Sequence, residues 1–295
     1  MEDNKTSLQQ ELLEAGVHFG HLKKKWNPKM LPYIFAEKKG IHIIDLNRTT
    51  EALEEAAAAL KSIARSGKKI MFVATKKQAK EIVADAAQKV NMPYVTERWL
   101  GGMLTNFSTI RKSVKKMQSI EKMLGDGTLE NITKKERLSL KRDKDKMEKV
   151  LGGISQLARL PAALFIVDIT NEHIALAEAR KLNVTTFGMV DTNSDPTRVD
   201  FAIPSNDDAT KSIAIITNYV AAAIAEGLQE RALNKEQEVV EEDDDNEKNI
   251  KNLEADGDED SRRNRRKSKE AGHGGLPKRR AATPGHGGRK PAQKR

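Results

Sequence analysis

The side chains with the clearest chemical potential are cations set beside flat rings near the amino terminus. Three consecutive lysines precede a tryptophan, and a histidine and a fourth lysine flank them. The members of this group are His21, Lys23, Lys24, Lys25, Trp26 and Lys29. Cations neutralise RNA phosphates and flat rings stack on unpaired bases, so the group indicates RNA binding. Trp26 could equally be a partly buried anchor, and with 2 Trp, 3 Tyr and 7 Phe a broad stacking platform is not expected.

A second basic group follows helical spacing between residues 104 and 157. Apolar residues recur every three or four positions in two stretches, which predicts two antiparallel helices zipped as a coiled coil. From Arg111 to Lys149 there are 13 Lys or Arg against 7 acids. A solvated helix face explains part of this charge. An arm that contacts phosphates explains better why bases outnumber acids. The candidates for phosphate contact are Arg111, Lys112 and Lys115 in this stretch and Arg98 shortly before it.

Polar residues at the ends of predicted strands raise the alternative of a nucleotide-using enzyme, with a site around Thr75, Asp168 and Asp191. Lys76 and Lys77 begin a predicted helix, and a helix amino terminus attracts phosphate. However, no Gly-x-Gly-x-x-Gly and no Walker loop follows any predicted strand. Turn and helix-cap roles also explain the Asp and Asn residues. An enzyme is therefore the weaker hypothesis.

No metal and no cofactor is expected. His18 and His21 have a spacing that metal ligands can share, but the chain has no cysteine and lacks the glutamate of a metalloprotease motif. The absence of cysteine also excludes disulfide scaffolds and thiol enzymes. No window of 18 apolar residues and no signal-peptide pattern occurs, so a cytoplasmic protein without a membrane span is expected.

Strand-like and helix-like segments alternate along the body of the chain. Apolar runs predict strands, and Ala-rich or periodic stretches predict helices between them. The predicted strands are 41–46, 69–75, 94–95, 163–168 and 184–190, and the predicted helices include 48–65 and 76–90. Near-continuous apolar strands separated by helices indicate a parallel sheet covered on both faces. Thr133 with Glu136, and Ser205 with Asp208, fit capping boxes, and the last helix is expected to end by Ala232.

The charge of the chain is unevenly distributed. Lys and Arg number 52 and Asp and Glu 43, for a net charge of +9. Residues 235–260 hold 13 acids and 3 bases, and residues 261–295 hold 13 bases and 1 acid. Such a segment buries too little apolar surface to fold alone, so a disordered tail is predicted. It could stay solvated, contact RNA through its basic part, or fold its acidic block back on its basic block.

Several motifs resemble one known family. They are Gly16-Val-His-Phe-Gly-His21, Trp26-Asn-Pro-Lys-Met30, Arg98-Trp-Leu-Gly-Gly-Met-Leu-Thr-Asn106, Asp191-Thr-Asn-Ser-Asp-Pro196 and Asn206-Asp-Asp208. Together they resemble the bacterial small-subunit ribosomal protein S-two family over roughly residues 6 to 230. Thr185 departs from the usual proline or alanine but suits a strand. The resemblance adds His18 and Asn106 to the candidate RNA-binding residues.

The resemblance implies a flavodoxin-like (Rossmann-like) parallel sheet with helices on both faces. Residues 1–104 and 158–232 would form this α/β domain, and 105–157 an inserted antiparallel coiled-coil helical hairpin. The disordered charged tail, residues 233–295, lies outside the resemblance and is predicted from its composition alone. The implied function is structural: a constituent of the small ribosomal subunit in translation, with no catalysis. The implied partners are small-subunit ribosomal RNA and other small-subunit proteins, including the large mRNA-binding protein S-one, and no homo-oligomer is expected. A protein-docking scaffold that binds no RNA is the third hypothesis.

Overall fold

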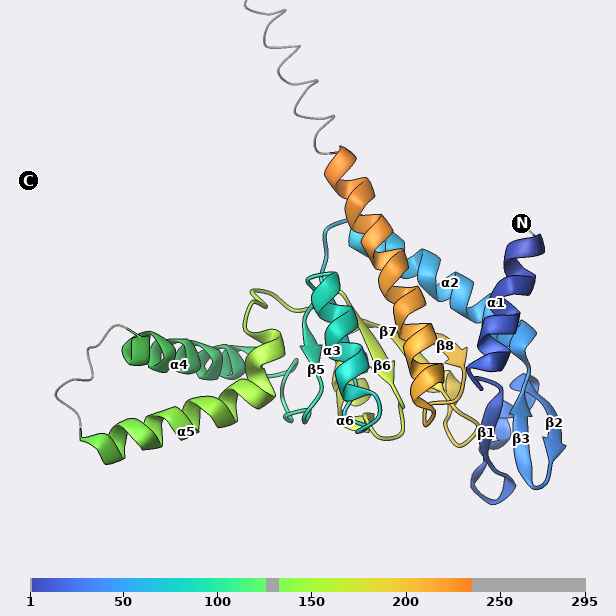
Figure 1. Cartoon of the computed structure of the whole chain (residues 1–295), viewed down its shortest axis with the longest axis horizontal. Coiled ribbons are helices and arrows are strands. Elements are labelled where there is room, and N and C mark those ends of the chain that lie inside the picture. The colour runs from blue at the N-terminus through green and yellow to red at the C-terminus, as the bar shows by residue number, and fades with distance from the viewer. Residues whose placement is uncertain (1, 126–132, 235–295) are drawn as a thin grey trace, which may run out of the picture. The chain divides into compact units, whose positions relative to one another are not determined.

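A five-stranded parallel sheet and a three-stranded antiparallel sheet organise the chain (Figure 1). The computed structural model describes residues 2–125 and 133–234. The parallel strands are β4 (Ile70–Val73), β5 (Tyr94–Val95), β6 (Ala163–Val167), β7 (Thr185–Val190) and β8 (Phe201–Pro204). Their spatial order, β5-β4-β6-β7-β8, is the 2-1-3-4-5 order of flavodoxin-like sheets. The predicted parallel α/β class is therefore confirmed.

Both faces of the parallel sheet are buried because successive strand residues point to opposite sides. In β4, Ile70 and Phe72 join one apolar cluster, while Met71 and Val73 join the other. The first cluster includes side chains of α2 (Leu46–Arg65), α3 (Lys80–Lys89) and a helix over 210–234. The second includes side chains of α6 (His173–Lys181) and the segment that leads into the hairpin helices. This double burial explains the continuous apolar runs in the sequence.

The antiparallel sheet was not expected from the sequence. It contains β1 (Phe19–Leu22), β2 (Ile34–Lys38) and β3 (Ile41–Ile44) in the order β1-β3-β2, after helix α1 (Glu2–Glu14). The strand predicted over 41–46 thus pairs with its own neighbours and not with the parallel sheet. Lys39 and Gly40 form the tight turn between β2 and β3, and their φ angles are 54° and 74°. Two short 3-10 helices, η1 (Lys23–Lys25) and η2 (Pro28–Tyr33), connect β1 to β2.

Two helices lie side by side between β5 and β6, α4 (Phe107–Gly125) and α5 (Lys134–Leu151) (Figure 1). The capping box predicted at Thr133 and Glu136 is confirmed, with both reciprocal hydrogen bonds present. A short 3-10 helix, η3 (Gly152–Ile154), follows α5. The sequence Gly125-Asp-Gly127 predicts a break between the two helices. Helix α4 ends at Gly125, and residues 126–132 lie outside the described residues.

The last described helix starts differently from the prediction. The Ser205 hydroxyl donates to the Ile203 carbonyl, and it is Asn206 whose side chain accepts the backbone N–H groups of Asp208 and Ala209. The Ser205–Asp208 capping box is therefore wrong, because Asn206 is the residue placed to receive these donors. The helix over 210–234 also continues past Ala232. The predicted tail lies outside the described residues after 234. Another 3-10 helix, η4 (Pro196–Arg198), precedes β8.

Within the described residues, each helix is too short or too polar for a membrane crossing.

Candidate functional site

The candidate RNA-binding residues fall into three places in the fold. One group lies on β1, η1 and η2 near the amino terminus, and Lys76 and Lys77 follow β4 at the carboxyl end of the parallel sheet. The third group lies at the start of α4 and just before it. This last group is Arg98, Asn106, Arg111, Lys112 and Lys115.

The lysines of η1 and η2 are exposed, but they differ in their partners. Lys23 pairs with Glu37 at 2.6 Å, and Lys29 pairs with Asp195 at 2.7 Å. The Lys29 ammonium also donates to the Thr197 hydroxyl at 3.2 Å. Among the described residues, Lys24 and Lys25 form no salt bridge. Lys25 nevertheless lies near enough to Asp208 for the two charges to interact, so among these lysines Lys24 is the one that a phosphate would meet without competition from a described carboxylate.

Trp26 is half-buried and packs inside the protein. Its ring lies 5.2 Å from the ring of His42, at an interplanar angle of 45°. The next residue, Asn27, donates its backbone N–H to the Thr192 carbonyl at 2.8 Å, and its side chain caps η2. These contacts fit the alternative role of Trp26 as a partly buried anchor.

His18 and His21 are directed into the protein to different degrees. The His18 ring lies 4.0 Å from the Phe19 ring, and within the described residues its buried Nδ1 has no hydrogen-bond partner. Burial lowers the pKa of His18. His21 lies 2.9 Å from Asp191 through Nδ1 and 3.3 Å from Asp208 through Nε2. The hydrogen bond to Asp191 raises the pKa of His21.

Lys76 lies where the strand order reverses. It follows β4, while Asp168 follows the neighbouring strand β6, and ligands of doubly wound sheets bind at such a position. In this chain an internal ion cluster occupies that position. The Lys76 ammonium lies 2.8 Å from Asp168, 2.7 Å from Asp207 and 2.8 Å from Asp208. Burial alone would lower the pKa of Lys76, but these carboxylates raise it above its ordinary value. Lys77, by contrast, is exposed.

The acids around Lys76 crowd one another. Burial, with Asp168 and Asp191 nearby, raises the pKa of Asp207 to about 7. One ligand atom each from His21, Asp191 and Asp207 lies within 4.8 Å of the others, and one oxygen of Asp207 accepts no hydrogen bond from the described residues. An imidazole and two carboxylates can hold a divalent cation. Sequence reasoning assigned Asp207 no role, although it stands in the Asn206-Asp-Asp208 motif and follows β8.

A buried carboxylate positions the third group. Glu178, on α6, accepts the indole N–H of Trp99 at 3.1 Å and the backbone N–H of Gly102 at 2.7 Å. It also accepts the backbone N–H groups of Leu104 and Thr105, at 2.9 and 3.0 Å. Burial would raise its pKa, but the backbone donors of Thr105 and Gly102 lower it below its ordinary value. Glu178 therefore fixes the loop from which α4 begins.

The solvent-exposed face of α4 is basic. Ile110, Val114, Met117 and Ile120 are buried, whereas the intervening basic residues are exposed. These exposed residues are Arg111, Lys112, Lys115 and Lys116. Arg98 is exposed as well, and the side chain of Asn106 accepts hydrogen bonds from the Ser108 and Thr109 hydroxyls near the start of α4. The cations of this group are thus presented to solvent on a fixed element.

Comparison with known proteins agrees with this architecture. A sequence profile of the family described as Ribosomal protein S2 matches residues 12–227. The small ribosomal subunit protein uS2 of Cytophaga hutchinsonii is 61% identical over 238 residues, which cover 81% of this chain and 94% of the relative. The same-named protein of Flavobacterium johnsoniae is 62% identical over 232 residues, 79% of this chain and 91% of the relative.

A third relative, the uS2 protein of Bacteroides thetaiotaomicron, is 62% identical over 224 residues, 76% of this chain and 81% of its own length. The matched region contains both sheets, the hairpin helices and the ion cluster around Lys76. The chain therefore belongs to the ribosomal protein S2 family and is a structural, non-enzymatic component of the small subunit of the cytoplasmic ribosome.

Proposed function

We propose that the chain binds small-subunit ribosomal RNA through two surfaces of exposed cations. The amino-terminal surface consists of Lys23, Lys24, Lys25 and Lys29, and the hairpin surface consists of Arg98, Arg111, Lys112 and Lys115. Arg and Lys supply most phosphate contacts in nucleic-acid complexes, and these contacts fix orientation without reading sequence. A structural component of a ribonucleoprotein needs that kind of binding.

The observation that carries the proposal is the division of α4 into two faces. Its apolar face is buried, so the exposed Arg111, Lys112 and Lys115 cannot turn inward, and no described carboxylate forms a salt bridge with them. Like charges held together on a rigid helix repel one another unless an anion lies between them. The phosphate backbone of RNA supplies such an anion.

Charge reversal at the hairpin tests this proposal against a matched control. Arg111→Glu with Lys112→Glu changes an adjacent, exposed Arg-Lys pair on α4, and Arg180→Glu with Lys181→Glu changes a similar pair on α6. The measurement is the fraction of each variant that sediments with small subunits after a high-salt wash. We expect loss of the α4 variant alone. Equal retention of both variants would contradict the RNA-binding surface.

Contact with neighbouring small-subunit proteins, including protein S-one, is proposed on different grounds. Large apolar side chains are exposed on β1, η2 and β2: Phe35 is 76% exposed, Leu31 64% and Leu22 53%. Exposed apolar groups of this kind mark protein interfaces. Leu31→Ser with Phe35→Ser should lower the S-one content of purified subunits while the chain itself stays bound. Light scattering of the free chain should give the mass of a monomer.

We also propose that residues 105–157 form an inserted coiled-coil arm and that residues 261–295 add a salt-sensitive RNA contact. The arm is supported by the buried stripe of α4 and by the Lys144–Glu121 ion pair of 2.9 Å between α5 and α4. The contact of residues 261–295 is supported by their 13 bases. Truncation after Asn234 should reduce the salt dependence of RNA binding, and an unchanged dependence would exclude the contact.

A further inference from the structure

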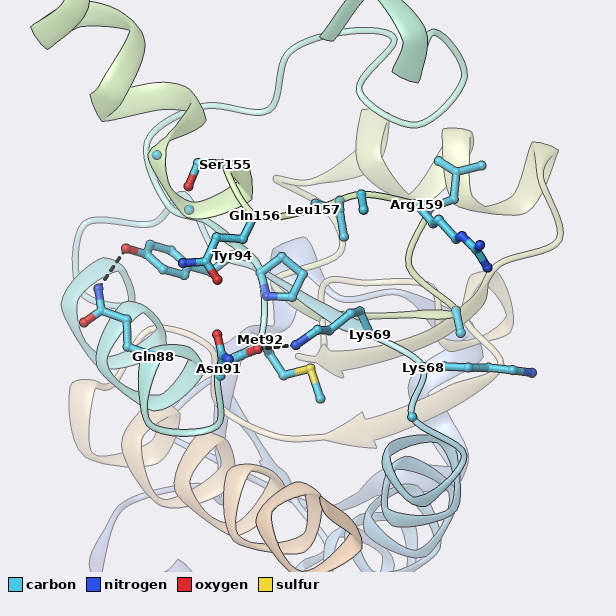
Figure 2. A pocket seen from close by; sticks show the side chains of 17 residues that line it. Lys68, Lys69, Gln88, Asn91, Met92, Tyr94, Ser155, Gln156, Leu157 and Arg159 are labelled. Carbon is cyan, nitrogen blue, oxygen red and sulfur yellow. Dashed lines mark hydrogen bonds between the residues drawn. The ribbon is translucent and has the colours of Figure 1, made fainter. Parts of the chain in front are cut away.

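A concave region lies at the amino-terminal edge of the parallel sheet, away from the ion cluster around Lys76. Its volume is about 690 Å³, within the range of ligand-binding pockets. Three segments that lead into parallel strands line it: residues 67–69 before β4, 91–93 before β5, and 152–162 before β6 (Figure 2). Because β5, β4 and β6 are neighbours, these segments meet at one edge.

One wall of the cavity depends on a glycine. A Cβ atom at Gly153 would collide with the backbone oxygen of Tyr94 and would lie 2.9 Å from a carbon of the Tyr94 ring. Only glycine therefore lets η3 pack directly on β5. This close packing holds the Tyr94 ring beside Ser155 and Gln156 (Figure 2).

The charged groups of the lining all have one sign. Lys68, Lys69 and Arg159 line the cavity, and within the described chain no Asp or Glu lines it. Lys69 donates to the backbone carbonyl of Asn91 at 2.7 Å, and this bond directs its ammonium toward Asn91 and Met92 (Figure 2). Lys68 and Arg159 are exposed and form no salt bridge with a described carboxylate. Three cations without a neutralising acid favour an anionic ligand.

The remaining lining suits a flat polar group. The half-buried Tyr94 ring is oriented by a hydrogen bond of 2.8 Å from the Gln88 amide to its hydroxyl. Met92 and Pro93 also line the cavity and add apolar atoms to it. The side-chain amides of Asn91 and Gln156 offer donors and acceptors (Figure 2). Unpaired bases stack on aromatic rings and form hydrogen bonds through their edges.

We propose that this cavity binds one unpaired nucleotide, with its base against Tyr94 and its phosphate near Lys68, Lys69 and Arg159. In the assembled subunit the nucleotide belongs to ribosomal RNA, a step that rests on the proposed RNA-binding function. Recognition of the nucleotide unit itself is a property of the isolated chain. It adds a stacking contact to the phosphate contacts proposed for the two surfaces of exposed cations.

Photo-crosslinking of the full-length chain tests the proposal. The probe is a fluorescein-labelled hexauridylate that carries one 4-thiouridine, and the readout is the crosslinked tryptic peptide 90–98, which contains Tyr94. Tyr94→Leu removes the ring, and Lys68→Glu with Arg159→Glu reverses two cations of the lining. We expect probe affinity at this site to fall about 5- to 150-fold when the ring is lost, the range measured for single base stacks. Arg180→Glu with Lys181→Glu is the control of equal charge change.

Competition of the probe with AMP and with inorganic phosphate shows whether the cavity takes a free nucleotide or a nucleotide within a strand. Displacement of the probe by AMP but not by inorganic phosphate supports a nucleotide site that also takes free nucleotides, and resistance to both supports a nucleotide held within a strand. Equal displacement by phosphate and AMP would overturn the proposal, because the ring would then contribute nothing. So would crosslinks to peptide 90–98 that both pocket variants leave unchanged. Circular dichroism and the urea midpoint show whether each variant folds.

Sedimentation with small subunits reports on the proposed function independently of the cavity. If the chain stays on subunits but gives no crosslinks at peptide 90–98, the nucleotide pocket is contradicted and the proposed function is not. If the chain gives crosslinks at this peptide but does not join subunits, the proposed function is contradicted and the pocket is supported.

Discussion

The carboxyl end of the parallel sheet and the exposed face of α4 both carry basic side chains, but the surroundings of these side chains differ. At the sheet, Lys76 is surrounded by three carboxylates and its side chain is only 16% exposed. On α4, Arg111, Lys112 and Lys115 are exposed and have no described carboxylate as a salt-bridge partner. The difference separates cations that stabilise the fold from cations left available to an external anion.

Removal of the cation from the ion cluster around Lys76 should therefore cause the largest loss in the free energy of unfolding. Lys76→Met leaves Asp168 and Asp207 buried without their cation, and breaking a buried ion pair on one side costs roughly 3 kcal/mol or more. Lys77→Met, next to it and exposed, should change the free energy of unfolding by less than about 0.5 kcal/mol. Urea denaturation of both variants measures the difference. Equal stability of the two variants would show that the cluster contributes little.

Glu178 bears on both regions because it links the sheet domain to the loop before the α4 surface. Glu178→Gln removes the negative charge that accepts the N–H groups of Trp99, Gly102, Leu104 and Thr105. Hydrogen bonds to a charged acceptor each contribute roughly 1.5–3 kcal/mol, and the amide oxygen keeps some of them, so we expect a loss of about 2 kcal/mol.

Hydrogen exchange at the backbone amides of Gly102, Leu104 and Thr105 measures the effect locally. These amides should exchange faster in Glu178→Gln, while those of β7 should change much less. Uniform acceleration across the sheet would mean that Glu178 stabilises the whole domain and not this loop in particular.

The pH dependence of stability distinguishes the ion cluster from the exposed cations. The folded-state pKa of His21 is raised by Asp191, so its contribution is present below about pH 6.5 and is lost as the pH rises through the folded value. Asp207 has a folded-state pKa of about 7 against 3.8, so the folded state holds its proton more tightly and stability again falls as the pH rises toward 7. His18, with a lowered pKa, acts in the opposite direction only below about pH 6.5.

The free energy of unfolding should therefore decrease by about 1 kcal/mol between pH 6.5 and 8. Asp207→Asn should flatten this slope because the amide does not titrate. Urea denaturation at a series of pH values provides the measurement. A slope that is the same in Asp207→Asn and the unaltered chain would assign the pH dependence to other groups.

The sequence predicts best those features that depend on neighbouring residues. The apolar runs at 70–73 and 163–167 are buried strands because a doubly covered parallel sheet needs no polar alternation. The capping box at Thr133 depends on a residue only three positions away. At Ser205, two adjacent residues could both cap a helix, and only the backbone geometry selects Asn206.

Features built from distant residues were not predicted. The Lys76–Asp207 contact joins residues 131 positions apart, so neither partner signals the other in the sequence. The antiparallel sheet was missed because β1 and β2 are short and contain charged or exposed residues. The cavity beside Tyr94 likewise arises from three loops that become neighbours only through the strand order.

The α4 substitutions should have the smallest effect on stability. They also test most directly whether the α4 cations, unlike Lys76, are left available to an external anion. Arg111→Gln, Lys112→Gln and Lys115→Gln together should lower the free energy of unfolding by less than about 0.5 kcal/mol, because exposed charges contribute little to folding. The same change should reduce the slope of log affinity against log salt concentration by about 2 to 3 if each cation neutralises one phosphate. Titration of a ribosomal RNA fragment at several salt concentrations measures the slope, with Arg180→Gln and Lys181→Gln as the control. An unchanged slope with unchanged stability would leave the α4 cations as solubilising charges, whereas a large loss of stability would place them with Lys76 among the cations that hold the fold.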